Sequence, residues 1–155
     1  MNAIVSIAYS PTDLPAEPED HYQRVPVSEA ALLVGHGIRG DRKGGSPKRQ
    51  LNIMSAETLA VLAQAGFQTA PGQMGEQIVI SGLDVNALAP GTQVQLGDTA
   101  CIEVISHRTG CDRFEHIQGH APSEAAGRLG AMAKVVTAGR IGVGDPVRLL
   151  TPEAA

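Results

Sequence analysis

The chain of 155 residues, of which 43% are hydrophobic, is long enough to bury a core as one domain and too apolar to be intrinsically disordered. A formal net charge of −4 at pH 7 argues against general nucleic-acid binding. No apolar run approaches the roughly 20 residues that span a bilayer, and the start of the chain lacks the basic region of a signal peptide. We therefore expect one cytoplasmic domain over residues 1–155 that binds neither nucleic acid nor a membrane.

The rest of the composition indicates the fold class and the redox state. Eighteen glycines and ten prolines predict many turns between short elements, and the scarcity of aromatic residues predicts an aliphatic core. Two cysteines do not make a disulfide framework, so we interpret both as free thiols. Cys101 lies in an apolar run and is expected to be a small core residue, whereas Cys111 lies in a polar stretch.

The first segments of the chain predict a strand, a loop and a second apolar element. Residues 3–8 are apolar and read as a strand. Residues 10–26 hold four prolines and a cluster of acidic residues (Asp13, Glu17, Glu19 and Asp20), which is typical of a solvated surface loop. An apolar pattern resumes from Val25 to Val34.

A basic, glycine-rich loop follows, and it carries the clearest charge anomaly of the sequence. Glycines let backbone N–H groups turn toward an anion, and arginines match the oxygens of a phosphate or carboxylate. The spacing fits neither a P-loop nor a dinucleotide-binding fingerprint. An anion site and a plain mobile loop both remain open, with Asp41 expected to hold the loop by pairing with Arg42 or Arg49. Between residues 39 and 49 lie five of the twelve basic residues and one acid: Arg39, Asp41, Arg42, Lys43, Lys48 and Arg49.

One helix is clearly predicted, after an apolar run at residues 51–54. Ser55 can cap it, Glu57 lies in its first turn, and Gly66 is a natural stop. Its apolar positions Leu59, Leu62 and Ala63 share a face and are expected to pack in the core.

The second half of the chain predicts short strands separated by turns. Gly97-Asp98 is a strong hairpin signal, and residues 122–129 are expected to form a short helix interrupted by Gly127. Glu76 ends a predicted turn, where it could bind backbone amides or form the wall of a pocket. Together the elements predict a mainly β fold, a β-barrel with a few short helices. The strands are expected at residues 77–81, 92–96, 100–105, 133–137 and 146–150.

The stretch from Ser106 to Glu115 reads as a loop and gathers a thiol with charged side chains. Arg108 and Arg113 would lower the pKa of Cys111 if they face it, because nearby cations favour the thiolate. An inert surface thiol is the plain alternative. Two others are a zinc site and a Cys–His nucleophile pair that uses His107 or His116. The zinc ligands would be His107, Cys111, His116 and His120, at a spacing that matches no common structural zinc module.

Taken together, these segments resemble the MOSC domain, the family named for the C-terminal domain of molybdenum cofactor sulfurase. The resemblance covers about residues 27–149, and it rests on the order and spacing of short pieces. The pieces are Gly37-Ile-Arg-Gly-Asp-Arg42, Arg49-Gln50, Glu57, Pro71-Gly72, Gly75-Glu76, Gly82-Leu-Asp84, Leu88, Gly97-Asp98, Arg108-x-x-Cys111 and Gly142-Val-Gly-Asp-Pro146.

The resemblance implies a β-rich barrel and a role in molybdenum or sulfur chemistry. Family members bind molybdenum cofactor, or are thought to carry sulfur, and Cys111 occupies the position proposed as sulfur carrier or molybdenum ligand. The resemblance thus implies Cys111 as the catalytic and metal-binding residue, and a small-molecule cofactor or a sulfur donor as partner. Sulfur transfer and reduction of N-hydroxylated compounds are the implied reactions. The implied cofactor-binding residues are Arg39, Asp41, Arg42, Lys43, Arg49, Glu76 and Arg108.

The chain departs from the common family pattern at three positions. Lys43 replaces a histidine found in many members, Gln77 replaces an asparagine, and Gly110 stands where proline or another residue commonly precedes the cysteine. A non-catalytic carrier that keeps the barrel without the reaction is therefore the competing hypothesis. A symmetric dimer is open, since no segment of the sequence compels it.

Overall fold

The computed structural model of the protein describes residues 2–13, 22–47, 49–110, 112–120 and 122–150. Eight strands form one sheet in which neighbours are antiparallel, except that β5 and β6 run parallel. The fold is therefore mainly β, as predicted. The strand order is β11 (Val147–Leu150), β7 (Gln93–Leu96), β8 (Ala100–His107), β9 (Ala131–Thr137), β5 (Leu51–Ser55), β6 (Ile78–Ser81), β1 (Ala3–Tyr9) and β2 (Val25–Val27).

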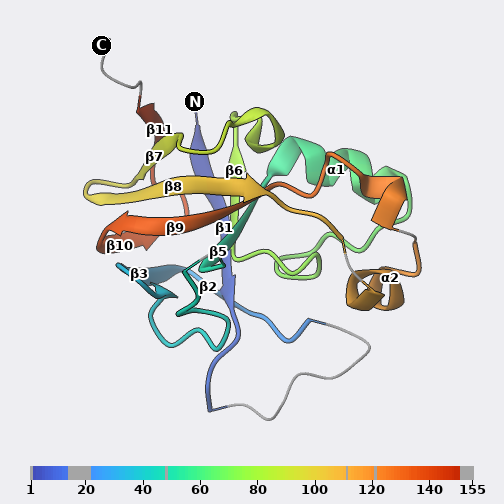
Figure 1. Cartoon of the computed structure of the whole chain (residues 1–155), viewed down its shortest axis with the longest axis horizontal. Helices are drawn as coiled ribbons and strands as arrows, with labels where there is room; N and C mark the ends of the chain where they lie inside the picture. Colours follow the sequence, from blue (N-terminus) through green and yellow to red (C-terminus); the bar gives the residue numbers. More distant parts are fainter. Residues whose placement is uncertain (1, 14–21, 48, 111, 121, 151–155) are drawn as a thin grey trace.

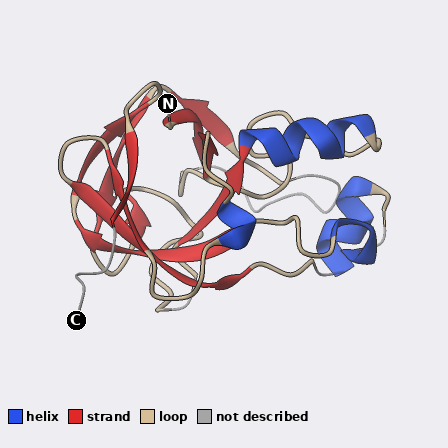
Figure 2. Ribbon diagram, turned by 90° about the horizontal axis from the view of Figure 1, so that it is seen from above, coloured by secondary structure: helices blue, strands red, loops and turns tan. Residues whose placement is uncertain are grey.

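The sheet curls until β1, the strand next to one end, is hydrogen-bonded to the chain at β11, the strand at the other end. An isolated antiparallel bridge joins Ala3 of β1 to Pro146, the residue before β11. The Ile4 N–H donates to the Asp145 carbonyl at 2.9 Å, and the Val147 N–H donates to the Asn2 carbonyl at 3.0 Å. Figure 2 shows the strands wrapped around a common interior. Aliphatic side chains fill this interior, among them Ile4, Ile7, Leu51, Ile53, Ile78, Ile80 and Ile102.

A second sheet of three strands lies beside the first, in the order β10 (Gly139–Gly142), β3 (Glu29–Leu33) and β4 (Gly37–Ile38). It buries Leu32, Ile38 and Ile141 in the same core. Strand β10 was not expected, because two glycines bound its four residues and weaken the sequence signal of a strand.

The helices gather at one side of the strands in both views (Figure 1, Figure 2). Helix α1 (Ala56–Gln64) forms the crossover that parallel strands β5 and β6 require. Helix α2 (Asp112–Gln118) and the 3₁₀ turn η2 (Pro122–Ala125) lie near its far end, while η1 (Val85–Ala87) follows β6. A second core lies under these helices and contains Met54, Leu59, Leu62, Phe67, Met74, Val79, Phe114, Ala125 and Leu129.

Three details of the helices differ from expectation. Ser55 is the N-cap of α1 but makes no side-chain cap bond, since its hydroxyl donates to the Leu83 carbonyl and accepts from the Val85 N–H. Ala63 is exposed, not packed in the core. The loop predicted for residues 106–115 is shorter than expected, because β8 extends to His107 and α2 begins at Asp112, which leaves residues 108–110 outside both elements. No helix in the described part of the chain is long and apolar enough to cross a membrane.

Candidate functional site

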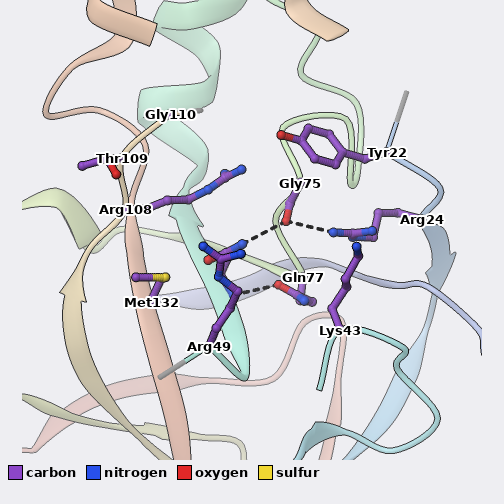
Figure 3. Close-up of a pocket in the computed structure, with 11 residues that line it drawn as sticks. Tyr22, Arg24, Lys43, Arg49, Gly75, Gln77, Arg108, Thr109, Gly110 and Met132 are labelled. Carbon is purple, nitrogen blue, oxygen red and sulfur yellow. Dashed lines mark hydrogen bonds between the residues drawn. The ribbon is translucent and has the colours of Figure 1, made fainter. Parts of the chain in front are cut away.

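A cavity of about 210 Å³ opens between the basic loop, the segment before β2, the turn before β6 and the end of β8 (Figure 3). Its lining comes from segments that are far apart in the sequence and are brought together by the sheet. The lining residues are Tyr22, Arg24, Lys43, Arg49, Asn52, Gly75, Gln77, Arg108, Thr109, Gly110 and Met132.

Four cationic side chains converge on this cavity. Arg24 precedes β2, Lys43 and Arg49 belong to the loop between β4 and β5, and Arg108 follows β8. Figure 3 shows these side chains approaching the space from different sides. The described lining contains no carboxylate, so the cavity is a concentrated positive field on a chain whose net charge is negative. Such a field attracts anions, and guanidinium groups present paired donors to phosphate or carboxylate oxygens.

One wall of the cavity is the Gly75 carbonyl, which accepts two side-chain hydrogen bonds. Arg24 Nη2 donates to it at 3.5 Å and Asn52 Nδ2 donates at 3.3 Å. Gly75 has φ +83°, and a Cβ there would lie 2.8 Å from Arg108 Nη2 and 3.1 Å from Tyr22 Cζ. A glycine is therefore required both by the backbone and by the close approach of two lining side chains.

An aromatic ring borders the same wall. The guanidinium carbon of Arg24 lies 5.5 Å from the centroid of the Tyr22 ring, within the range of a cation–π contact. The contact holds two lining residues against each other, and it orients Arg24 toward the Gly75 carbonyl.

Asp41 holds the basic loop from beneath the cavity. Its Oδ1 accepts from the backbone N–H groups of Ser10 and Lys43, each at 3.1 Å, and its Oδ2 accepts from Gln77 Nε2 at 3.1 Å. Gln77 Oε1 in turn accepts from the Asn52 N–H at 2.7 Å. Asp41 does hold the loop, as expected, but through two backbone amides and a buried glutamine.

Glu76 is buried behind the Gly75 wall and does not line the cavity. Its two carboxylate oxygens accept from the backbone N–H groups of Gly72 and Met74, at 2.9 and 3.1 Å. Burial raises the pKa of Glu76, while these amide hydrogen bonds and the charge of Arg108 act in the opposite direction. Of the two roles predicted for Glu76, the structure shows amide binding, which fixes the turn that carries Gly75.

The structure brings together some of the predicted site residues and separates others. Lys43, Arg49 and Arg108 line the cavity. Arg39 and Arg42 do not: Arg39 is exposed, and Arg42 Nη2 donates to the Thr12 carbonyl. Cys111 lies outside the described residues, so its role stays a prediction. The residue before it in sequence, Gly110, lines the cavity together with the basic loop.

Tyr22, Arg24 and Asn52 are among the lining residues that were not predicted as site residues. Tyr22 and Arg24 end the proline-rich segment, so the prediction of a solvated spacer is wrong for that end. The sequence marks Arg24 only as a cation directly before an apolar segment, which does not by itself assign it to this cavity. Asn52, a polar side chain within an apolar strand, was a comparable signal.

Two of the histidines that were considered as zinc ligands make other contacts. His107 Nε2 lies 3.0 Å from the Leu88 carbonyl, and the His120 ring stacks on Phe67 with centroids 4.4 Å apart. Among the described residues, no group of three or more His, Cys, Asp or Glu side chains could hold a metal ion. Cys101 is buried in β8, as predicted.

Comparison with known proteins identifies the fold. A family model described as "MOSC domain" matches residues 40–148. Among solved structures, YiiM from Geobacillus stearothermophilus is 20% identical with TM-score 0.73, covering 97% of this chain and 76% of that one. YiiM from Escherichia coli is 20% identical with TM-score 0.71, covering 99% and 72%. The YUAD protein from Bacillus subtilis is 19% identical with TM-score 0.73, covering 95% and 94%. A search of the curated proteins finds no match. Because the family model spans most of the strands and the loop that supplies Lys43 and Arg49, the chain belongs to the MOSC domain family.

Proposed function

We propose that this MOSC protein binds a molybdopterin-type cofactor at the basic cavity, with Cys111 as molybdenum ligand or sulfur carrier. The observation that supports the proposal most is the convergence of four cationic side chains on one cavity with no carboxylate in its described lining. Such a cofactor ends in a phosphate, which is the chemical group that this arrangement suits. The residues that would hold it are Arg24, Lys43, Arg49 and Arg108.

The cationic side chains have complementary roles in anion binding. Arg24 and Arg108 flank the Gly75 wall, where planar guanidinium groups can offer two parallel N–H donors to one phosphate. Lys43 contributes a compact charge from a loop whose backbone Asp41 holds in place. The phosphate is thereby fixed in orientation as well as neutralised in charge.

The side-chain oxygen of Asn52 favours a ligand that carries hydrogen-bond donors as well as a phosphate. Its Oδ1 is buried and has no hydrogen-bond partner among the described residues, whereas its Nδ2 donates to Gly75. A buried acceptor without a donor is costly, and a bound group with N–H donors would satisfy it. A pterin ring has such donors, whereas a bare inorganic anion does not.

The thiol at Cys111 gives the site its chemistry. When bound, the cofactor supplies a metal centre that exchanges oxygen and sulfur ligands and carries electrons. The chain supplies a soft thiolate, which suits a molybdenum ligand or a persulfide. Arg108 lies three positions before Cys111 in the sequence and lines the cavity. Sulfur transfer and reduction of N-hydroxylated compounds both use these groups.

Metal analysis tests the proposal directly. The protein is purified from a host that makes molybdenum cofactor, as wild type and as Cys111→Ala, and molybdenum per chain is measured for both. We expect molybdenum in the wild type and a loss of most of it in Cys111→Ala. Molybdenum in both proteins, or in neither, would remove the ligand role of Cys111. Metal-loaded wild type without turnover of sulfur donors or N-hydroxylated compounds would favour the carrier hypothesis.

A matched pair of charge reversals tests the cavity separately. Arg49 lines it and Arg42, seven positions earlier in the same loop, does not. Using inorganic pyrophosphate as the probe, we expect Arg49→Glu to weaken binding by about tenfold or more, because a charged hydrogen bond is lost and a like charge is added. Arg42→Glu should stay close to wild type. Equal losses in the two variants would show that general surface charge, and not this cavity, binds the anion.

A further inference from the structure

The turn that forms the cavity wall is held from the outside by one buried side chain of helix α2. Gln118, the last residue of α2, is 5% exposed although it carries a carboxamide. Its Nε2 donates to the carbonyls of Gln68 at 3.0 Å and Gln73 at 2.9 Å, and its Oε1 accepts from the Gln68 N–H at 2.8 Å. Both ends of the carboxamide are therefore bound to residues 68–73.

This segment leads directly into the Gly75 wall. Gln118 Nε2 also lies 3.1 Å from the Met74 sulfur, while the Met74 N–H donates to Glu76. The Gly75 N–H donates to the Gly72 carbonyl at 2.9 Å. Gln118 therefore forms hydrogen bonds to one side of the turn and Glu76 to the other, and together they fix the position of the Gly75 carbonyl.

Apolar packing places Gln118 where it can make these bonds. Phe114, one turn earlier in α2, is fully buried, and its ring centroid lies 6.1 Å from that of Phe67. Phe67 directly precedes Gln68, the residue that Gln118 binds through both its N–H and its carbonyl. Phe114 thus packs the helix into the core, and the hydrogen bonds of Gln118 fix the helix relative to residues 68–73.

We infer that Gln118 is a positioning residue for the cavity. Its hydrogen bonds fix α2 relative to the turn at residues 68–76, and this keeps the Gly75 carbonyl within hydrogen-bond distance of Arg24 and Asn52. Helix α2 begins at the residue after Cys111, so the same contact sets the helix that follows the cysteine against the cavity wall. This role of Gln118 deepens the proposed function and rests on it for the part that concerns cofactor binding. The contact itself can be tested without any ligand.

The test compares Gln118→Met with Gln95→Met. Gln95 is a matched control, because its Nε2 also donates to two backbone carbonyls, of Gly97 and Asp98, while its Oε1 accepts from Arg148. Those contacts lie at the β7–β8 hairpin and not at the cavity. Both substitutions keep the length of the side chain and remove its carboxamide.

Two NMR readouts on ligand-free protein decide the inference. In Gln118→Met, the Met74 and Gly75 amides should exchange about tenfold faster, and the Asn52 side-chain amide signals should shift as the bond to Gly75 weakens. Ile7 and Ile80 amides serve as a reference for the barrel. In Gln95→Met all of these signals should match wild type. Unchanged exchange at Met74 and Gly75, or an unchanged Asn52 signal, in Gln118→Met would overturn the inference.

Gln118→Glu adds a readout that loss of packing alone would not give. A carboxylate can accept from the Gln68 N–H but cannot donate to the two carbonyls, whereas its protonated form regains one donor. The exchange of Met74 and Gly75, taken as a ratio to wild type at each pH, should therefore recover as the pH is lowered. A ratio that is flat with pH counts against the inference.

Pyrophosphate titration of the same proteins separates this inference from the proposed function. We expect Gln118→Met to bind the probe several-fold more weakly than Gln95→Met. A wild type that binds no pyrophosphate would overturn the anion site, while the ligand-free signals would still decide the role of Gln118. Normal affinity in Gln118→Met, despite faster exchange, would overturn its positioning role.

Discussion

Gln77 and Asp41 share a buried hydrogen bond that joins the start of β6 to the basic loop. Gln77 Nε2 donates to Asp41 Oδ2 at 3.1 Å, and the two side chains are 3% and 1% exposed. Asp41 also accepts from the Lys43 N–H, and Gln77 also accepts from the Asn52 N–H. The Asp41–Gln77 pair therefore links Lys43 and Asn52, which both line the cavity. Gln77, which replaces a family asparagine, thus forms hydrogen bonds through both ends of its carboxamide.

Removing the Gln77 carboxamide should destabilise the protein clearly. Gln77→Met leaves one oxygen of Asp41 without this partner in a buried place and the Asn52 N–H without a partner in a half-buried place, and each such group costs about 1–3 kcal/mol. We expect the free energy of unfolding, from urea denaturation, to fall by about 2–4 kcal/mol. Gln95→Met should lose much less, since Gln95 is half-buried and water can replace its partners. A similar small loss in both variants would mean that the Asp41 contact contributes little.

Glu76 should make stability depend on pH in a defined direction. Burial raises the pKa of this carboxyl in the folded state above its ordinary 4.5. The folded protein therefore holds the proton more tightly than the unfolded chain, and the stability that this gives is fully present below the unfolded pKa. It is lost as the pH rises through the folded pKa.

The matching experiment is urea unfolding of wild type and Glu76→Gln from pH 4 upward. Glu76→Gln cannot ionise, so the difference in unfolding free energy, wild type minus variant, should fall as the pH rises from about the ordinary carboxyl range. A difference that grows with pH would mean that the hydrogen bonds from Gly72 and Met74, together with Arg108, outweigh burial.

Much of the barrel could be predicted because its strands are continuous aliphatic runs. Strands β1, β6, β7, β8, β9 and β11 coincide with predicted strands, β5 coincides with the apolar run at residues 51–54, and the Gly97-Asp98 hairpin joins β7 to β8 as expected. Helix α2 was not predicted because only two of its seven residues, Phe114 and Ile117, are apolar, and two positions do not show a helical repeat in the sequence. In the structure Phe114 packs against Phe67. Tertiary contact, and not local propensity, forms this helix.

The cavity could be predicted only in part. Lys43 and Arg49 were visible as a charge cluster, and Arg108 as a cation near a thiol. Arg24 could not be assigned to them, because it reaches the cavity through the antiparallel pairing of β1 with β2, which local sequence does not specify. The buried bonds of Asp41 and Gln77 depend in the same way on the order β5-β6-β1 in the sheet.

Cys101 should react slowly with alkylating reagents in the folded protein. Burial, and after it the charge of Glu103, raise the pKa of this thiol, so little of it is the reactive thiolate at neutral pH. In a Cys111→Ala background, iodoacetamide should label native protein far more slowly than unfolded protein. Glu103→Gln should raise the native rate modestly, since it removes the secondary cause and leaves burial. Rapid labelling of native Cys111→Ala would contradict this prediction.

The close approach at Gly75 gives the most specific test of the cavity. Gly75→Ala forces a side chain onto φ +83°, and its Cβ would press on Arg108 and Tyr22. Gly91 has φ +91°, and a Cβ there would meet nothing within 4 Å, so Gly91→Ala carries the backbone strain alone. Each variant should lose about 1–3 kcal/mol from the left-handed conformation. Gly75→Ala should in addition displace Arg108 and weaken pyrophosphate binding, whereas Gly91→Ala should bind as wild type does. If Gly75→Ala binds pyrophosphate normally, the anion does not depend on the wall that Gly75, Arg24 and Arg108 form, and the ligand must be sought elsewhere on the basic loop.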